Sequence, residues 1–68
     1  MNLSEVFKRK GFKYKYVYTL GSLDDPNNMN MVDGWEKDLL SVQQLEEQKR
    51  TLMKNYKKPV LNVEVVEL

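Results

Sequence analysis

The stretch Phe12–Leu20, "FKYKYVYTL", decides the fold because two kinds of side chain alternate along it with a period of two residues. Aromatic and apolar residues occupy the even positions, whereas the odd positions hold Lys13, Lys15, Val17 and Thr19. A period of two is that of a β-strand with one buried face, and aromatic side chains fit such a strand well. We therefore predict a strand here, with its tyrosine side turned into the core.

A short helix is expected before this strand. Asn2 can cap its first turn, and Glu5 follows three residues later, which is the spacing of a capping box. Gly11 is a natural residue at which such a helix stops. The predicted apolar stripe of this helix consists of Leu3, Val6 and Phe7.

A second, longer helix is predicted from a strong start signal. Ser41 and Gln44 have the spacing of a capping box, flanked by leucines placed as a hydrophobic staple. The helix should run from about Val42 to Lys57 and end before Pro59, because a proline disfavours helical backbone in the preceding residue. Its predicted inner stripe consists of Val42, Leu45, Leu52, Met53 and Tyr56.

The connection between the strand and the long helix is harder to assign. Asp25-Pro26 favours the start of a turn, and Asp33-Gly34 is the dipeptide that a two-residue type I′ hairpin requires. Asp33 could instead cap a helix, or the segment could be a loop. The start signal at Ser41 makes little sense inside a helix that is already running, so it favours the hairpin.

The chain ends in a β-branched segment, Val60–Glu67, which we predict as a final strand with Leu61, Val63 and Val65 facing inward. The expected fold class is therefore α+β in one domain, residues 1–68, with a short N-terminal helix, an antiparallel β-meander, one main helix packed on the sheet and a C-terminal strand. A meander followed by a capped helix resembles, in topology alone, the arm-type DNA-binding domains of integrases, whose three-stranded sheet enters the major groove. The resemblance covers residues 12–57.

The composition argues against several kinds of chemistry. The 68 residues include no cysteine and no histidine, so disulfides, thiolate or imidazole metal sites and histidine-based catalysis are not expected. Asp24 and Asp25 form a carboxylate pair that could do acid–base work, but they lie in a predicted surface turn, and so small a chain has little room for a pocket that excludes water. We expect no enzymatic activity, no cofactor and no metal. The absence of a long apolar segment predicts no membrane span and a cytoplasmic location.

The charge is divided between two neighbouring blocks. The first twenty residues carry a net +4 and the next twenty a net −4. A basic segment can contact phosphate, so nucleic-acid binding is one hypothesis. Its predicted residues are Lys8, Arg9, Lys10, Lys13 and Lys15.

The other hypothesis is a protein-binding surface beside the acidic block, where tryptophan and methionine, both common at interfaces, accompany the carboxylates. Its predicted residues are Asp24, Asp25, Met29, Met31, Asp33 and Trp35. Trp35 could equally be the largest core residue. The final strand, if it lies at a sheet edge, could pair with another chain as a homodimer or by β-strand addition.

We therefore expect a small non-enzymatic protein-binding or regulatory module. The alternative is a nucleic-acid-binding module that contacts phosphate through its basic segment. So small a chain, rich in lysine and asparagine, would suit an accessory protein of a phage or another mobile element.

Overall fold

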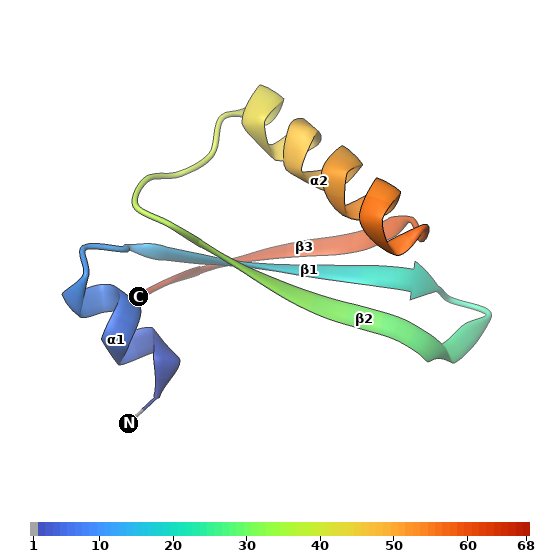
Figure 1. The fold of residues 1–68 in the computed structure, drawn as a ribbon, viewed down its shortest axis with the longest axis horizontal. Coiled ribbons are helices and arrows are strands. Elements are labelled where there is room, and N and C mark those ends of the chain that lie inside the picture. Colours follow the sequence, from blue (N-terminus) through green and yellow to red (C-terminus); the bar gives the residue numbers. More distant parts are fainter. Residues whose placement is uncertain (1) are drawn as a thin grey trace.

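A computed structural model describes residues 2–68 as a three-stranded sheet with a helix on each side (Figure 1). The α+β class and the antiparallel sheet are as predicted. In chain order, the elements are α1 (Leu3–Arg9), β1 (Tyr14–Ser22), β2 (Asp25–Glu36), α2 (Val42–Tyr56) and β3 (Val60–Glu67).

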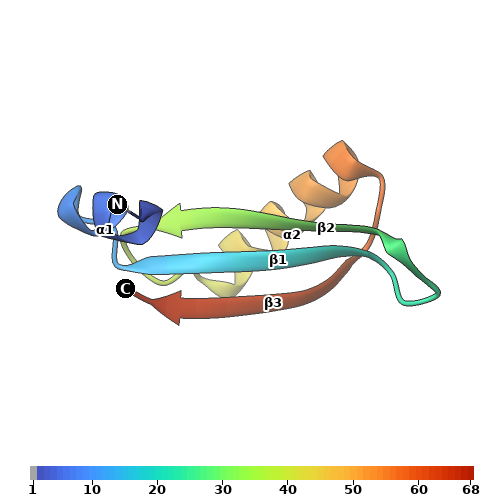
Figure 2. The same ribbon diagram turned by 90° about the horizontal axis from the view of Figure 1, so that it is seen from below.

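β1 is the central strand of the sheet. The order is β2-β1-β3, and β1 pairs antiparallel with both neighbours. α2 lies over one face of the sheet, and α1 lies on the opposite side at one end (Figures 1 and 2). Because β1 is the only strand with a neighbour on both sides, the alternation of its side chains determines what lies on each face of the sheet.

The tyrosine side of β1 is the core, as predicted. Tyr16, Tyr18 and Leu20 are 3%, 3% and 0% exposed, respectively. Packed against them are partly buried residues from all three strands and from α2 and its approach: Tyr14, Val32, Leu40, Leu45, Leu52, Val60 and Val63. Burial, followed by the charge of Glu36 and the neighbouring Tyr16, raises the pKa of Tyr18.

The predicted hairpin at Asp33-Gly34 is wrong, since both residues lie within the continuous strand β2. A type I′ turn would require a positive φ at Gly34, and Gly34 has none. It lies instead beside the buried tyrosines of β1. It pairs with Tyr16, and a Cβ built on it would lie 3.4 Å from Cε2 of Tyr18. Gly34 therefore lies directly against the buried tyrosines, where a large side chain would crowd the Tyr18 ring.

The chain turns earlier, at Leu23-Asp24. Ser22 pairs with Asp25 across this turn, and the Asp24 N–H donates to Ser22 Oγ at 3.2 Å. Asp25-Pro26 therefore begins β2 rather than a turn; proline is tolerated because β2 is an edge strand. Only two strands precede α2, so the sheet has three strands, and the three consecutive strands on which the integrase resemblance depended are absent from residues 2–68.

The hairpin reaches beyond the rest of the sheet (Figures 1 and 2). We call residues 21–29 the hairpin arm, because β3 pairs with β1 only as far as Leu20. Gly21 begins the arm with φ +147°, and a Cβ on it would lie 2.8 Å from Cγ of Met29 and 2.9 Å from the carbonyl oxygen of Asn28. Glycine is required here because both the backbone conformation and the close approach exclude a side chain.

Both helices start as predicted. In α2, Ser41 Oγ accepts from the Gln44 N–H at 3.1 Å, and Gln44 Oε1 accepts from the Ser41 N–H at 2.9 Å. In α1, Asn2 Oδ1 accepts from the Glu5 N–H at 2.9 Å. These side chains satisfy backbone donors that a helix start leaves without an acceptor, which explains why both helices begin where they do.

The predicted apolar stripes are only partly correct. Val42 and Tyr56 are 81% and 40% exposed, because the N-terminal end of α2 stands away from the sheet and Tyr56 is its last residue (Figure 1). Leu3 of α1 is likewise 65% exposed. In β3, an irregularity opposite Thr19 and Leu20 leaves Leu61 without a partner, so Val60 packs on the core in its place.

The Tyr16 hydroxyl also fixes the connection between β2 and α2. It accepts the backbone N–H of Leu40 at 2.9 Å, in a partly buried position 24 residues away in the chain. A phenylalanine would fill the same space but leave this donor without its acceptor. The hydrogen bond therefore explains why a tyrosine is useful at a fully packed position.

We predict that Tyr16→Phe lowers the free energy of unfolding by about 1 kcal/mol, the net value of one partly buried hydrogen bond. Urea denaturation followed by circular dichroism measures the change. Tyr56→Phe is the matched control, because Tyr56 is exposed and removal of its hydroxyl should change the midpoint little. Equal effects of the two substitutions would contradict the assigned role of the Tyr16 hydroxyl.

Candidate interaction surfaces

The face of the sheet opposite α2 is largely uncovered, and we call it the open face (Figure 2). The strand registers place its side chains in three rows across β2, β1 and β3. The rows are Met31, Thr19 and Asn62; Asp33, Val17 and Glu64; and Trp35, Lys15 and Val66. Apolar, acidic and polar side chains therefore alternate over this surface.

Two apolar side chains of the open face are exposed to solvent. Met31 is 72% exposed and Val66 is 40% exposed, while Val17 and Thr19 between them are half-buried. Contact with another molecule would remove this apolar surface from water, which is favourable. The open face is therefore the first candidate for contact with another molecule.

Lys15 is held within the open face. Its Nζ lies 3.9 Å from Asp33 Oδ2 and 5.4 Å from the centre of the Trp35 ring. Both contacts are attractive, and they stabilise the ammonium group of Lys15 in this position. Lys15 therefore belongs to the same surface as two of the predicted protein-binding residues, and it is not a free cation.

Trp35 lies outside the main core and attaches α1 to the sheet. Its ring stacks on Phe7 with the ring centres 4.3 Å apart and the planes 6° from parallel. Phe7 also meets Phe12 edge to face at 5.3 Å. Lys10 and Lys37 lie over the Phe7 and Phe12 rings at 5.9 and 5.5 Å. This small aromatic cluster was not foreseen, because Trp35 is distant in sequence from Phe7 and Phe12.

The predicted protein-binding residues form two adjoining groups. Met31, Asp33 and Trp35 share the open face, whereas Asp24, Asp25 and Met29 lie on the hairpin arm. The tip of the arm also exposes Leu23, which is 83% accessible and was not among the predicted residues. Both groups lie along β2 and the turn before it, so one partner could contact them together.

The predicted nucleic-acid-binding residues are divided differently. Lys8, Arg9, Lys10 and Lys13 are exposed on α1 and just after it, at the end of the sheet far from the arm (Figure 1). We call these four residues the basic end. Lys15 is separated from them by its contact with Asp33. The five cations therefore do not form one free patch.

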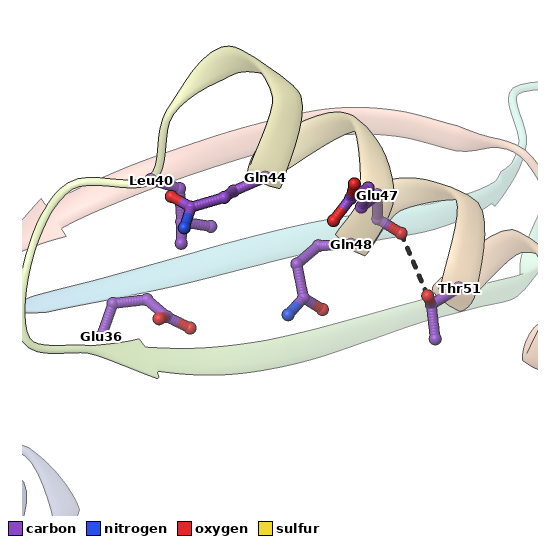
Figure 3. A pocket seen from close by; sticks show the side chains of 6 residues that line it. All are labelled: Glu36, Leu40, Gln44, Glu47, Gln48 and Thr51. Atoms are coloured by element: carbon purple, nitrogen blue, oxygen red, sulfur yellow. Dashed lines mark hydrogen bonds between the residues drawn. The ribbon is translucent and has the colours of Figure 1, made fainter.

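A groove of about 370 Å³ separates α2 from β2 on the other face of the sheet. Glu36 reaches under α2 from β2, and Gln48 points from α2 toward the strand (Figure 3). The lining residues are Glu36, Leu40, Gln44, Glu47, Gln48 and Thr51. The Thr51 hydroxyl donates to the Glu47 carbonyl oxygen at 3.0 Å, so this polar side chain is already satisfied within the helix. The groove is an open, polar and acidic space.

Two further findings concern residues 2–68. In that part of the chain, no three acidic, histidine or cysteine side chains come together in a way that could hold a metal ion. None of its helices combines the length and the apolar character needed to cross a membrane.

Comparison of the chain with protein-family models, curated proteins and solved structures finds no match.

We predict that Trp35→Ala releases α1 while leaving the main core folded. A helix of seven residues is unstable alone, so loss of its stacking partner should unfold it. NMR chemical shifts of Leu3–Arg9 should move toward random-coil values, and stability should fall by about 1–2 kcal/mol, less than for removal of a fully buried aromatic residue. Phe7→Ala removes the other ring of the same stack and should also release α1. Unchanged α1 shifts in both variants would contradict this role.

Proposed function

We propose that this protein is a small non-enzymatic protein-binding module. Its docking surface is formed by β2 and the arm, and the observation that supports the proposal most strongly is the uncovered sheet face with Met31 at 72% exposure. The surface comprises Asp24, Asp25, Met29, Met31, Asp33 and Trp35. We add Leu23, because it is the most exposed apolar residue of the arm.

The chemistry of this surface suggests the chemistry of the partner. Methionines adapt their shape to an apolar pocket, and Met29 and Met31 stand two residues apart on the same strand. Among the described residues, no ion pair involves Asp24 or Asp25, so both carboxylates are available to a cationic partner. We therefore infer a partner protein that presents an apolar patch bordered by lysine or arginine.

A second candidate function is supported by the basic end. Its four cations are exposed and lie far from the acidic arm. They could contact phosphates without reading bases, because the tyrosines beside them in sequence are buried. Four phosphate contacts would give a log-log salt slope of about −3.6 on duplex DNA. Binding of this kind would be independent of sequence and weak at physiological salt.

The proposed docking surface is tested by comparing two lysine substitutions at exposed apolar residues. Met31→Lys places a cation on the open face, and Val42→Lys places the same side chain on α2, where the native valine is 81% exposed. Immobilised wild-type protein and both variants are incubated with lysate of the native host, and captured proteins are identified and titrated. We expect one partner bound by wild type and Val42→Lys, with affinity reduced about tenfold or more by Met31→Lys.

Two outcomes would contradict the proposal. Equal capture of the partner by both lysine variants would place the interface elsewhere. Salt-sensitive binding to a labelled duplex at about 150 mM salt, lost when Lys8 and Lys10 are replaced by glutamate but retained in Met31→Lys, would favour the basic end instead.

A further inference from the structure

β3 leaves one edge of the sheet without a partner strand. At its C-terminal end the Leu68 N–H points toward β1 and donates to the Lys13 carbonyl at 2.8 Å, and from Asn62 to Glu67 the pairing with β1 is regular. In an antiparallel pair the direction alternates from one residue to the next. The backbone groups of Val63, Val65 and Glu67 therefore point away from β1, toward the free edge.

The sequence of this edge has the same pattern in both directions. From Leu61 to Val65 it reads Leu-Asn-Val-Glu-Val, which is apolar and polar in strict alternation around Val63. A second copy related by a two-fold axis at Val63 would place Val63 against Val63 and Leu61 against Val65. It would also place the Asn62 amide, a hydrogen-bond donor, against the Glu64 carboxylate, an acceptor, twice by symmetry.

We propose that two copies of this chain pair antiparallel through β3 in this register, forming a continuous six-stranded sheet. Val63 has its backbone groups directed outward, as a residue on the two-fold axis must if it is to bond to its own counterpart. The partner would also cover the exposed apolar edge, since Val65 is 46% exposed and Val66 is 40% exposed.

Neighbouring registers fit less well. An axis at Glu64 would place two carboxylates directly opposite each other, which destabilises a strand pair. An axis at Val65 would place the charged Glu67 opposite Val63 and Glu64 opposite Val66. In the register centred on Val63, Leu61 meets Val65 and the Glu64 carboxylate meets the Asn62 amide.

The other edge of the sheet is less suited to pairing. β2 contains Pro26, which has no N–H to donate to a further strand. Proline is a feature by which edge strands avoid association. β3 (Val60–Glu67) contains no proline, so its outward N–H groups are free to bond to a second strand. The irregularity at Leu61 limits regular pairing between two copies to a short segment. We therefore expect a reversible dimer through β3 rather than an extended assembly.

This inference does not depend on the proposed function, because the docking surface and β3 lie on opposite edges of the sheet. The test uses purified full-length protein and two substitutions at one exposed position. Asn62→Lys places a cation opposite the partner's glutamate at two symmetric positions, and Asn62→Asp places a carboxylate there. Within one copy the residue opposite Asn62 is the uncharged Thr19 of β1, so the charge across the β1–β3 pair does not change.

Sedimentation equilibrium over a range of protein concentrations measures the dissociation constant of the dimer. We expect Asn62→Lys to tighten the dimer about tenfold and Asn62→Asp to weaken it about tenfold, from two cross-strand charge pairs. Both shifts should shrink at high salt. Asn55→Lys and Asn55→Asp, on the exposed surface of α2, make the same charge changes and should leave the constant unaltered.

The proposal is overturned if wild type and Asn62→Lys both remain monomeric at about 1 mM protein. It is also overturned if the two Asn62 variants shift the constant in the same direction, or by no more than the Asn55 controls. A dimer that is disrupted by Met31→Lys and indifferent to Asn62 would show that the open face, and not β3, joins the copies.

Discussion

The burial of one row of side chains on the central strand supports the whole structure. Tyr16, Tyr18 and Leu20 of β1 are the buried hydrophobic residues, and the partly buried residues of the core pack against them. β2 contributes Val32 and the space above Gly34, and α2 packs against the same row. Each neighbouring element therefore depends on β1 for its burial, and in a chain of this size no second core on the same side can compensate for its loss.

The same arrangement explains where function can lie. One amphipathic helix covers one face of a three-stranded sheet, and the other face receives only α1 at one end (Figure 2). The chain stabilises that face locally, through the stacking of Trp35 on Phe7 and the contact of Lys15 with Asp33. Met31 and the arm lie beyond this local cluster and keep their apolar surface exposed. This exposed apolar surface is the reason that we propose binding to another protein.

Local patterns predicted much of the fold. The alternation from Phe12 to Leu20 identified the core strand and its buried side, and the Ser41 capping box located the start of α2. Both signals act through neighbouring residues, so a sequence can reveal them. Asp33-Gly34 was misinterpreted because its glycine lies inside a strand, against Tyr16 and Tyr18, which are distant in the sequence.

The candidate surfaces were predictable to a lesser degree for the same reason. Composition identified Met31 and the carboxylates, but the division between open face and arm follows from the turn at Leu23-Asp24. The position of Trp35 against Phe7 depends on how α1 returns to the sheet, and the unpaired Leu61 depends on the register of β3. Tertiary contacts of this kind have no signature in a single sequence.

Native-state hydrogen exchange tests most directly whether β1 supports the rest of the structure. The amides of Tyr16–Leu20 should exchange slowest, with an opening free energy equal to that of global unfolding. Amides of α1 and of the arm should exchange faster, through local opening, because they pack outside the main core. If the amides of α2 stayed protected after those of β1 had exchanged, the helix would have stability of its own and the central role of β1 would be refuted.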